Sequence, residues 1–196
     1  MKRVNVAVAS LTVGTLVLTG WLPLHAKTSH RSKGVSDKTF MMKAAQGGMT
    51  EVQLGQMASE KGASNAVKEF GQRMVTDHSK ANDQLKQVAA QKGVTLPTDI
   101  GAKNKALAAR LSKLSGAAFD RAYVTAMVKD HKEDVAEFKK ESTHGKDQDV
   151  KSFAAQTLPV ITDHLKMVTM MKQNMSGRGA NHAGTHSVNG MAGGGH

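Results

Sequence analysis

The sequence contains no cysteine and few aromatic residues. Of its 196 residues, 4% are aromatic and none is cysteine. Without thiols, the chain cannot form disulfides, thiolate metal sites, a cysteine nucleophile or a lipid-modified cysteine. The sequence also contains no G-x-S-x-G, no phosphate-binding glycine loop and no H-E-x-x-H. The signs of a hydrolase are therefore missing, and a non-enzymatic protein is favoured.

Proline is also scarce, with three residues in the whole chain. The residues that are frequent instead, such as Ala, Leu, Lys, Gln, Met and Glu, are good helix formers. A hydrophobic content of 39% is enough for one compact domain with a real core. The composition therefore predicts an all-α domain.

The chain is basic but has no dense basic segment. Its formal net charge is +11, and its lysines are mostly interleaved with acidic residues, as in KDHKED at 129–134. Such alternation is typical of a solvated helix face. Since no Lys/Arg run with interleaved aromatics occurs, we expect no nucleic-acid partner. Attraction to an anionic membrane surface stays open, and the sequence indicates no other partner.

The first 26 residues have the pattern of an export signal. Lys2 and Arg3 precede an apolar run that is densest at 11–18, and the segment ends in alanine. This pattern predicts a signal peptide at 1–26, since the run is too short and too rich in Thr and Gly to span a membrane. A polar linker at 27–36 follows. We expect an exported protein of the periplasm, with outer-membrane association as the other option.

Helical periodicity dominates the rest of the chain. In 67–91, for example, apolar residues recur at the three- and four-residue spacing of one helix face. Gly62 and Gly145 mark short turns, so the long helices form two hairpins joined by a long connection. The sequence thus predicts a four-helix bundle at 37–174 and a disordered, Gly/His-rich tail at 175–196. The expected long helices are 37–61, 65–92, 116–142 and 147–174, with a short helix at 103–114 in the connection.

Four segments carry a resemblance to a known family. They are, in chain order, FMMKAAQGGMTEVQLGQMA, VKEFGQRMVTDH, LSGAAFDRAYVTAMVKDH and VKSFAAQTLPVITDHLKMV. With the leader, they resemble a family of exported bacterial ferritin-like proteins of unknown function, often labelled outer-membrane proteins. The resemblance implies a ferritin-like four-helix bundle in the cell envelope, and it brings no established reaction.

Each long helix has one side chain of a metal-ligand type on its apolar stripe. Imidazole and carboxylate groups together suit Zn²⁺, Fe²⁺, Mn²⁺ or Cu²⁺, and facing helices of a bundle are where such sites form. The alternative is a Glu–His hydrogen-bond network without metal, because buried polar groups usually have partners. The candidate ligands are Glu51, His78, His131 and His164.

The motif of catalytic ferritin-like proteins is absent. Di-iron bundles use Glu-x-x-His on two helices, whereas Val75, Val128 and Ile161 stand three residues before the histidines. We therefore expect a mononuclear site or none, and disfavour ferroxidase chemistry. The aspartates that directly precede the histidines point away from the stripe, and are expected to be solvated or to contact a neighbouring helix. They are Asp77, Asp130 and Asp163.

The carboxyl-terminal segment is a second, separate candidate. It contains His182, His186 and His196 in a glycine-rich context and follows a Met-rich helix end. Imidazole and thioether groups fit the capture of copper or Ni²⁺. The alternative is a tail without a binding role.

Three functions remain, in decreasing order of support. The first is an exported cell-envelope helical bundle with a binding or stress-protective, non-enzymatic role. The second is a metal-binding protein that uses the interior Glu/His cluster, the tail, or both. The third is a ferritin-like metal-dependent oxidoreductase, which the missing Glu-x-x-His motifs disfavour.

Overall fold

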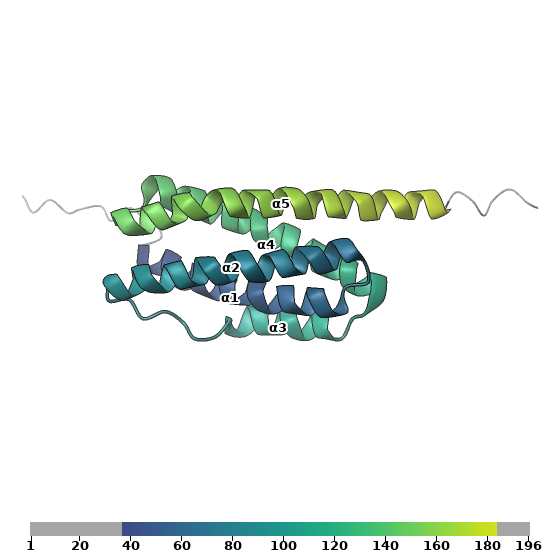
Figure 1. Ribbon diagram of the computed structural model, residues 1–196, viewed down its shortest axis with the longest axis horizontal. Helices are drawn as coiled ribbons and strands as arrows, with labels where there is room; N and C mark the ends of the chain where they lie inside the picture. Colours follow the sequence, from purple (N-terminus) through teal and green to yellow (C-terminus); the bar gives the residue numbers. More distant parts are fainter. Residues whose placement is uncertain (1–36, 184–196) are drawn as a thin grey trace, which may run out of the picture. The chain divides into compact units, whose positions relative to one another are not determined.

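The computed structural model describes residues 37–183, with side chains up to residue 177. Within that range the chain forms five helices and no strand, as Figure 1 shows, so the predicted all-α class is confirmed. The predicted signal peptide at 1–26 and linker at 27–36 lie outside the described residues. The helices are α1 (Asp37–Lys61), α2 (Asn65–Gln91), α3 (Gly101–Ser112), α4 (Gly116–His144) and α5 (Gln148–Ala183).

The four long helices form two hairpins. Helix α1 packs along α2, and α4 packs along α5, while α2 also meets α5 and α1 meets α4. The crossover between the hairpins carries α3, which lies beside α1 in Figure 1 and contacts both α1 and α4. The predicted bundle of two hairpins, joined by a long crossover with a short helix, is thus confirmed.

The turn into α2 is closed by polar groups from two helices. Ser64 is the N-cap of α2, and its side chain accepts a hydrogen bond from the backbone N–H of Val67. The carboxylate of Asp120 in α4 accepts from the backbone N–H groups of Ala63 and Ser64, both at 2.9 Å. The first turn of α2 is thereby attached to the start of α4.

Helix α5 is longer than the sequence indicates. Its predicted end was Asn174, but the helix continues to Ala183. Met171 and Met175 pack against the core on the apolar stripe of α5, so burial still favours helix past the predicted end. The predicted tail therefore begins with helical residues, and 184–196 lie outside the described part.

Two apolar clusters form the core. One contains Leu54, Phe70 and Met127, and the other contains Leu85 and Phe138. Along each long helix, residues of one cluster precede a short polar interval and residues of the other cluster follow it. The polar intervals therefore lie at one level in the middle of the bundle.

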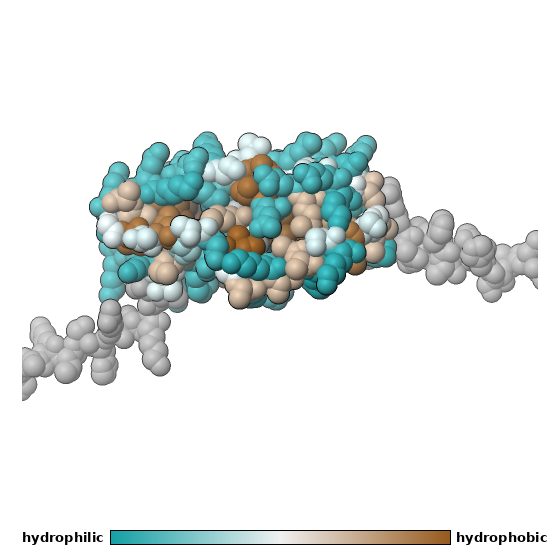
Figure 2. Space-filling view, turned by 90° about the horizontal axis from the view of Figure 1, so that it is seen from below, coloured by the Kyte–Doolittle hydropathy of each residue, from teal (hydrophilic) through white to brown (hydrophobic). Residues whose placement is uncertain are grey.

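The surface of the bundle is mainly polar. Figure 2 shows one face, on which hydrophilic side chains surround scattered hydrophobic ones. Met42, Val160 and Met170 are the large apolar side chains that are exposed among the described residues. No described helix has the length and apolar composition that a membrane crossing requires.

Candidate metal centre

The polar level of the bundle contains the four side chains that the sequence singled out. Glu51 comes from α1, His78 from α2, His131 from α4 and His164 from α5. Their exposed fractions are 3%, 4%, 0% and 0%, respectively. The structure thus brings all four together in the interior. Their binding of a metal ion stays a prediction.

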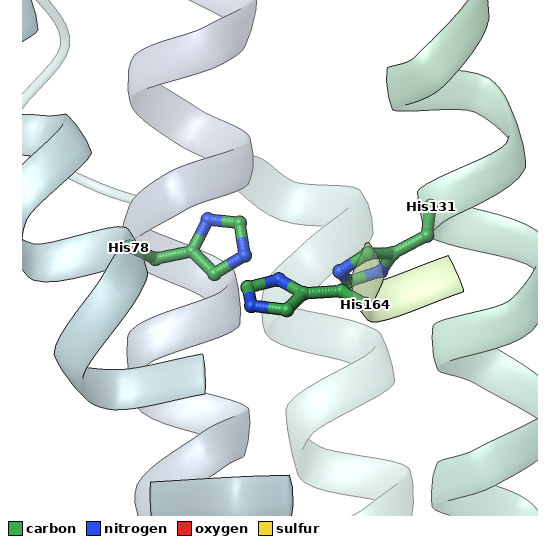
Figure 3. Close-up of side chains that lie close together, drawn as sticks. All are labelled: His78, His131 and His164. Atoms are coloured by element: carbon green, nitrogen blue, oxygen red, sulfur yellow. The ribbon is translucent and has the colours of Figure 1, made fainter. Parts of the chain in front are cut away.

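The three imidazole rings form a compact triangle, which we call the three-histidine cluster (His78, His131 and His164). The ring centroids are 5.7 Å apart for His78 and His131, 5.2 Å for His78 and His164, and 5.6 Å for His131 and His164. Figure 3 shows the rings pointing toward one another from three helices. One nitrogen from each ring lies within 4.8 Å of the other two. Since metal–imidazole bonds are about 2.0–2.1 Å long, the three nitrogens would have to move closer together to bind one ion.

Each ring has one nitrogen paired with an oxygen outside the triangle. Nδ1 of His78 lies 2.8 Å from Oε2 of Glu51, and Nε2 of His164 lies 2.8 Å from Oδ2 of Asp77. Nδ1 of His131 donates to the carbonyl oxygen of Met127 at 3.1 Å. Such outer oxygens fix the ring orientation and leave the lone pair on the other nitrogen.

The remaining ring nitrogens have no partner. They are buried and make no hydrogen bond in the described structure: Nε2 of His78, Nε2 of His131 and Nδ1 of His164. Leaving a buried polar atom unsatisfied costs about 1–3 kcal/mol. Three such atoms at one point are the donor set that a metal ion satisfies.

Burial keeps the three imidazoles neutral. It lowers the pKa of His78 to about 4 and the pKa of His131 to about 3. Burial also lowers the pKa of His164, although the hydrogen bond with Asp77 acts in the opposite direction. Neutral imidazole is the form that binds metal, so near pH 7 no proton has to leave these rings first.

Carboxyl groups lie directly beside the triangle. Burial raises the pKa of Glu51 well above its usual range, and the nearby charge of Asp130 adds to this. Burial and the charge of Glu51 likewise raise the pKa of Asp134, which is hydrogen-bonded to Glu51. Both carboxyls therefore bind a proton more readily than an exposed carboxyl does.

The sequence interpretation missed two of these carboxyls. Asp134 was not singled out, although it stands three residues after His131 and so lies on nearly the same helix face, a spacing that could have identified it. Asp130 was expected to be solvated or to contact a neighbouring helix, and it is partly buried near Glu51. Asp77 does contact a neighbouring helix through His164, whereas Asp163 is exposed.

The structure does not test the tail candidates. The side chain of His182, and His186 and His196 entirely, lie outside the described residues. Metal capture by the tail therefore stays a prediction.

Known structures share the fold of this chain. CopM in the Cu(II)-bound form matches with a TM-score of 0.61 and 15% identity, over 71% of this chain and 97% of that one. CopM in the Cu(I)-bound form matches with a TM-score of 0.60 and 16% identity, over 71% and 96%. A DUF305 fragment from Deinococcus radiodurans matches with a TM-score of 0.63 and 14% identity, over 70% and 95%. At these identities the matches establish a common fold.

Sequence comparison corrects the resemblance drawn from the motifs. No curated protein gives a significant match. The family model that matches is the domain of unknown function DUF4142, over residues 23–171. The assignment to a ferritin-like family is wrong, because this family and the CopM and DUF305 structures are the matches found. The chain belongs to the DUF4142 family.

Proposed function

We propose that this protein is an exported, non-enzymatic copper-binding protein that holds one copper ion at the three-histidine cluster. The observation that carries the proposal is the convergence of three buried histidine rings, each with one buried nitrogen that makes no hydrogen bond. They come from three different helices, so only the folded bundle presents them together.

A hydrogen-bond network without metal explains the outer contacts of the rings, but it leaves the other ring nitrogens without a hydrogen bond. Glu51 pairs with one nitrogen of His78, and Asp77 pairs with one nitrogen of His164. Each of these bonds uses the outward nitrogen and leaves the inward one unsatisfied. A cation at the centre would satisfy all three inward nitrogens at once, which supports metal binding over the network alone.

The donor set favours copper among the ions considered. Nitrogen ligands bind Cu²⁺ more tightly than Mn²⁺, Fe²⁺ or Zn²⁺, and neutral imidazole suits copper. The similarity to CopM, solved in Cu(II)-bound and Cu(I)-bound forms, supports the same metal class here. Zn²⁺ is the nearest competitor, because three histidines also form zinc sites.

The surroundings of the cluster favour binding over catalysis. The cavity beside Glu51 and His78 has a volume of about 20 Å³, which is room for a single water molecule. An organic substrate does not fit there. With the export signal expected at 1–26, this supports a periplasmic protein that keeps copper away from other reactants.

Copper stoichiometry tests the proposal. In the mature chain, with His182, His186 and His196 all replaced by alanine, one Cu²⁺ per chain is expected by elemental analysis after desalting. His131→Ala in that background should lose the ion. The matched control is His144→Ala, an exposed histidine on the same helix. The interior site would be rejected if the chain with the three tail substitutions bound no copper. It would also be rejected if that chain kept all of its copper after His131→Ala.

A further inference from the structure

A second group of converging atoms lies next to the three-histidine cluster. We call it the carboxylate cluster: Glu51, Asp130, Asp134 and His131. One ligand atom from each of these residues lies within 4.8 Å of the other three. Each residue also has a buried atom that makes no hydrogen bond: Oε1 of Glu51, Oδ2 of Asp130, Oδ2 of Asp134 and Nε2 of His131.

The cluster is built mainly by one helix. Asp130 and Asp134 are one turn apart on α4, and His131 lies between them in sequence. Glu51 reaches across from α1, and its Oε1 lies 3.5 Å from Nε2 of His131. The ring of His131 is fully buried and turns this unpartnered nitrogen toward the carboxyls.

No basic side chain is in direct contact with the carboxyls. Among the described residues, no lysine or arginine forms an ion pair with Glu51, Asp130 or Asp134, and Lys103 and Lys129 act on Asp130 through their charge alone. Glu51 pairs with His78 and His131. Carboxylates at i and i+4 on a helix repel one another when both are ionised. Buried carboxylates at such short range need either protons or a cation.

We propose that Glu51, Asp130, Asp134 and His131 form a second metal site, for a divalent cation that prefers oxygen ligands. Three carboxylate oxygens with one imidazole nitrogen match ions such as Mn²⁺, whereas the three-nitrogen set matches copper. The second site stands on its own residues, so it does not require that copper bind at the first.

The two sites share one atom. The Nδ1–H of His131 donates to Met127, so only Nε2 is free to bind a metal. This nitrogen belongs to both clusters, and one lone pair binds one ion at a time. The sites therefore compete, and copper loading weakens the binding of Mn²⁺. This competition rests on the proposed copper site.

Mn²⁺ titration of the metal-free mature chain tests the proposal, with the free ion followed by electron paramagnetic resonance. Wild type should bind one Mn²⁺ per chain. Asp134→Asn should weaken this binding about 10- to 100-fold and keep the copper stoichiometry. The matched control is Asp163→Asn, the same substitution at an exposed aspartate of α5, which should bind Mn²⁺ as wild type does.

Crossed variants separate the two sites. His164 belongs only to the three-histidine cluster, so His164→Ala should lose copper and keep Mn²⁺. His131→Ala should lose both ions, and copper loading of wild type should weaken Mn²⁺ binding about tenfold or more. Equal Mn²⁺ affinity in Asp134→Asn and Asp163→Asn, or no Mn²⁺ binding by wild type, would overturn the second site even if copper binds. Unchanged Mn²⁺ affinity after copper loading would overturn the sharing of His131.

A folding defect would not mimic these results. Asp134→Asn removes a buried ionisable group while nearly preserving its shape, so the melting temperature of the metal-free protein should not fall. Circular dichroism of each variant gives this check. A marked loss of helix in Asp134→Asn would contradict the account of Asp134 as a cation ligand rather than a structural group.

Discussion

At the residue scale, the outer oxygen partners decide which nitrogen of each histidine faces inward. The carboxylate of Asp77 is partly exposed, and it pairs with the guanidinium of Arg73 as well as with the ring of His164. Its contact with Nε2 of His164 leaves Nδ1 facing the cluster. In the proposed copper site, Asp77 thus orients His164 without itself being a ligand.

Replacing Asp77 by alanine should therefore weaken copper binding without removing a ligand. We expect a loss of about 10- to 100-fold in affinity, as is typical of outer partners of metal-bound histidines. Competition titration against a chelator of known affinity measures it. Asp163→Ala, an exposed aspartate directly before His164, should leave the affinity unchanged. Equal affinities of the two variants would refute the orienting role of Asp77.

A second residue-scale feature is the contact between the carboxyls of Glu141 and Asp37, near the C-terminal end of α4. Burial, together with a hydrogen bond and the charge of Asp37, raises the pKa of Glu141 from 4.5 to about 7. Burial works against ionisation of Asp37 too, but the backbone N–H groups of Lys146 and Asp147 lower the pKa of that carboxyl. Asp37 thus carries the charge, and Glu141 keeps its proton at pH values below about 7.

This arrangement makes stability depend on pH. The folded state binds the Glu141 proton more tightly than the unfolded state, so the free energy of unfolding should fall as pH rises from about 4.5 to about 7. The full shift corresponds to about 3 kcal/mol, and nearby solvent reduces the expected effect to about 1–2 kcal/mol. Urea unfolding at pH 5 and pH 8 measures the effect. The free energy of unfolding of wild type should contain this decrease at the higher pH, and that of Glu141→Gln should lack it. An identical pH dependence of the two proteins would be evidence against the raised pKa.

At the element scale, α1 and α2 cross with almost no space between their backbones. A Cβ built on Gly71 would lie 2.6 Å from the carbonyl oxygen of Gly55, and one on Gly55 would lie 2.7 Å from that of Gly71. The glycines therefore set the distance between the helices of the first hairpin. The same hairpin presents Glu51 to His78.

Gly71→Ala should force the two helices apart and lower the free energy of unfolding. Overpacking of this kind costs about 1–3 kcal/mol, which exceeds the helix-propensity gain of alanine. The control is Gly47→Ala, because nothing lies within 4 Å of a Cβ at that position. That change should stabilise by about 0.5–1 kcal/mol. Thermal unfolding compares them, and a Gly71→Ala protein at least as stable as Gly47→Ala would contradict the close crossing.

Helix positions and the pairing of helices into hairpins were largely predictable from the sequence, and individual contacts between helices were not. The apolar periodicity placed α1 at its observed limits and put His78, His131 and His164 on inward faces. It could not reveal the close crossing at Gly71, because a glycine in a helix pattern has no periodic signal. Nor could it reveal Asp134 as a partner of Glu51, since that contact depends on the relative height of two helices.

At the scale of the whole bundle, the polar level interrupts an otherwise apolar core. Two apolar clusters enclose it, and its groups are buried at a cost that packing elsewhere has to offset. The periodicity that predicted four helices is common to many bundle families. That is why the motifs pointed to a ferritin-like family while the chain belongs to DUF4142.

Copper should stabilise the whole bundle because its ligands come from three helices. An ion that binds only the folded state, at 100 times its dissociation constant, adds about 2.7 kcal/mol. For a domain of this size we expect a rise of about 5–10 °C in melting temperature. Differential scanning calorimetry should show this rise in wild type and not in His131→Ala. A rise of the same size in both proteins would place the binding elsewhere.

Counting the nitrogen ligands of the bound copper tests the central claim most directly. The sample is the mature chain with His182, His186 and His196 replaced by alanine, loaded with one equivalent of Cu²⁺. Pulsed electron paramagnetic resonance should detect three imidazoles on the copper, and fewer after replacing His78, His131 or His164. A copper signal with one imidazole or none, or one that those replacements leave unchanged, would contradict a metal centre in the bundle core.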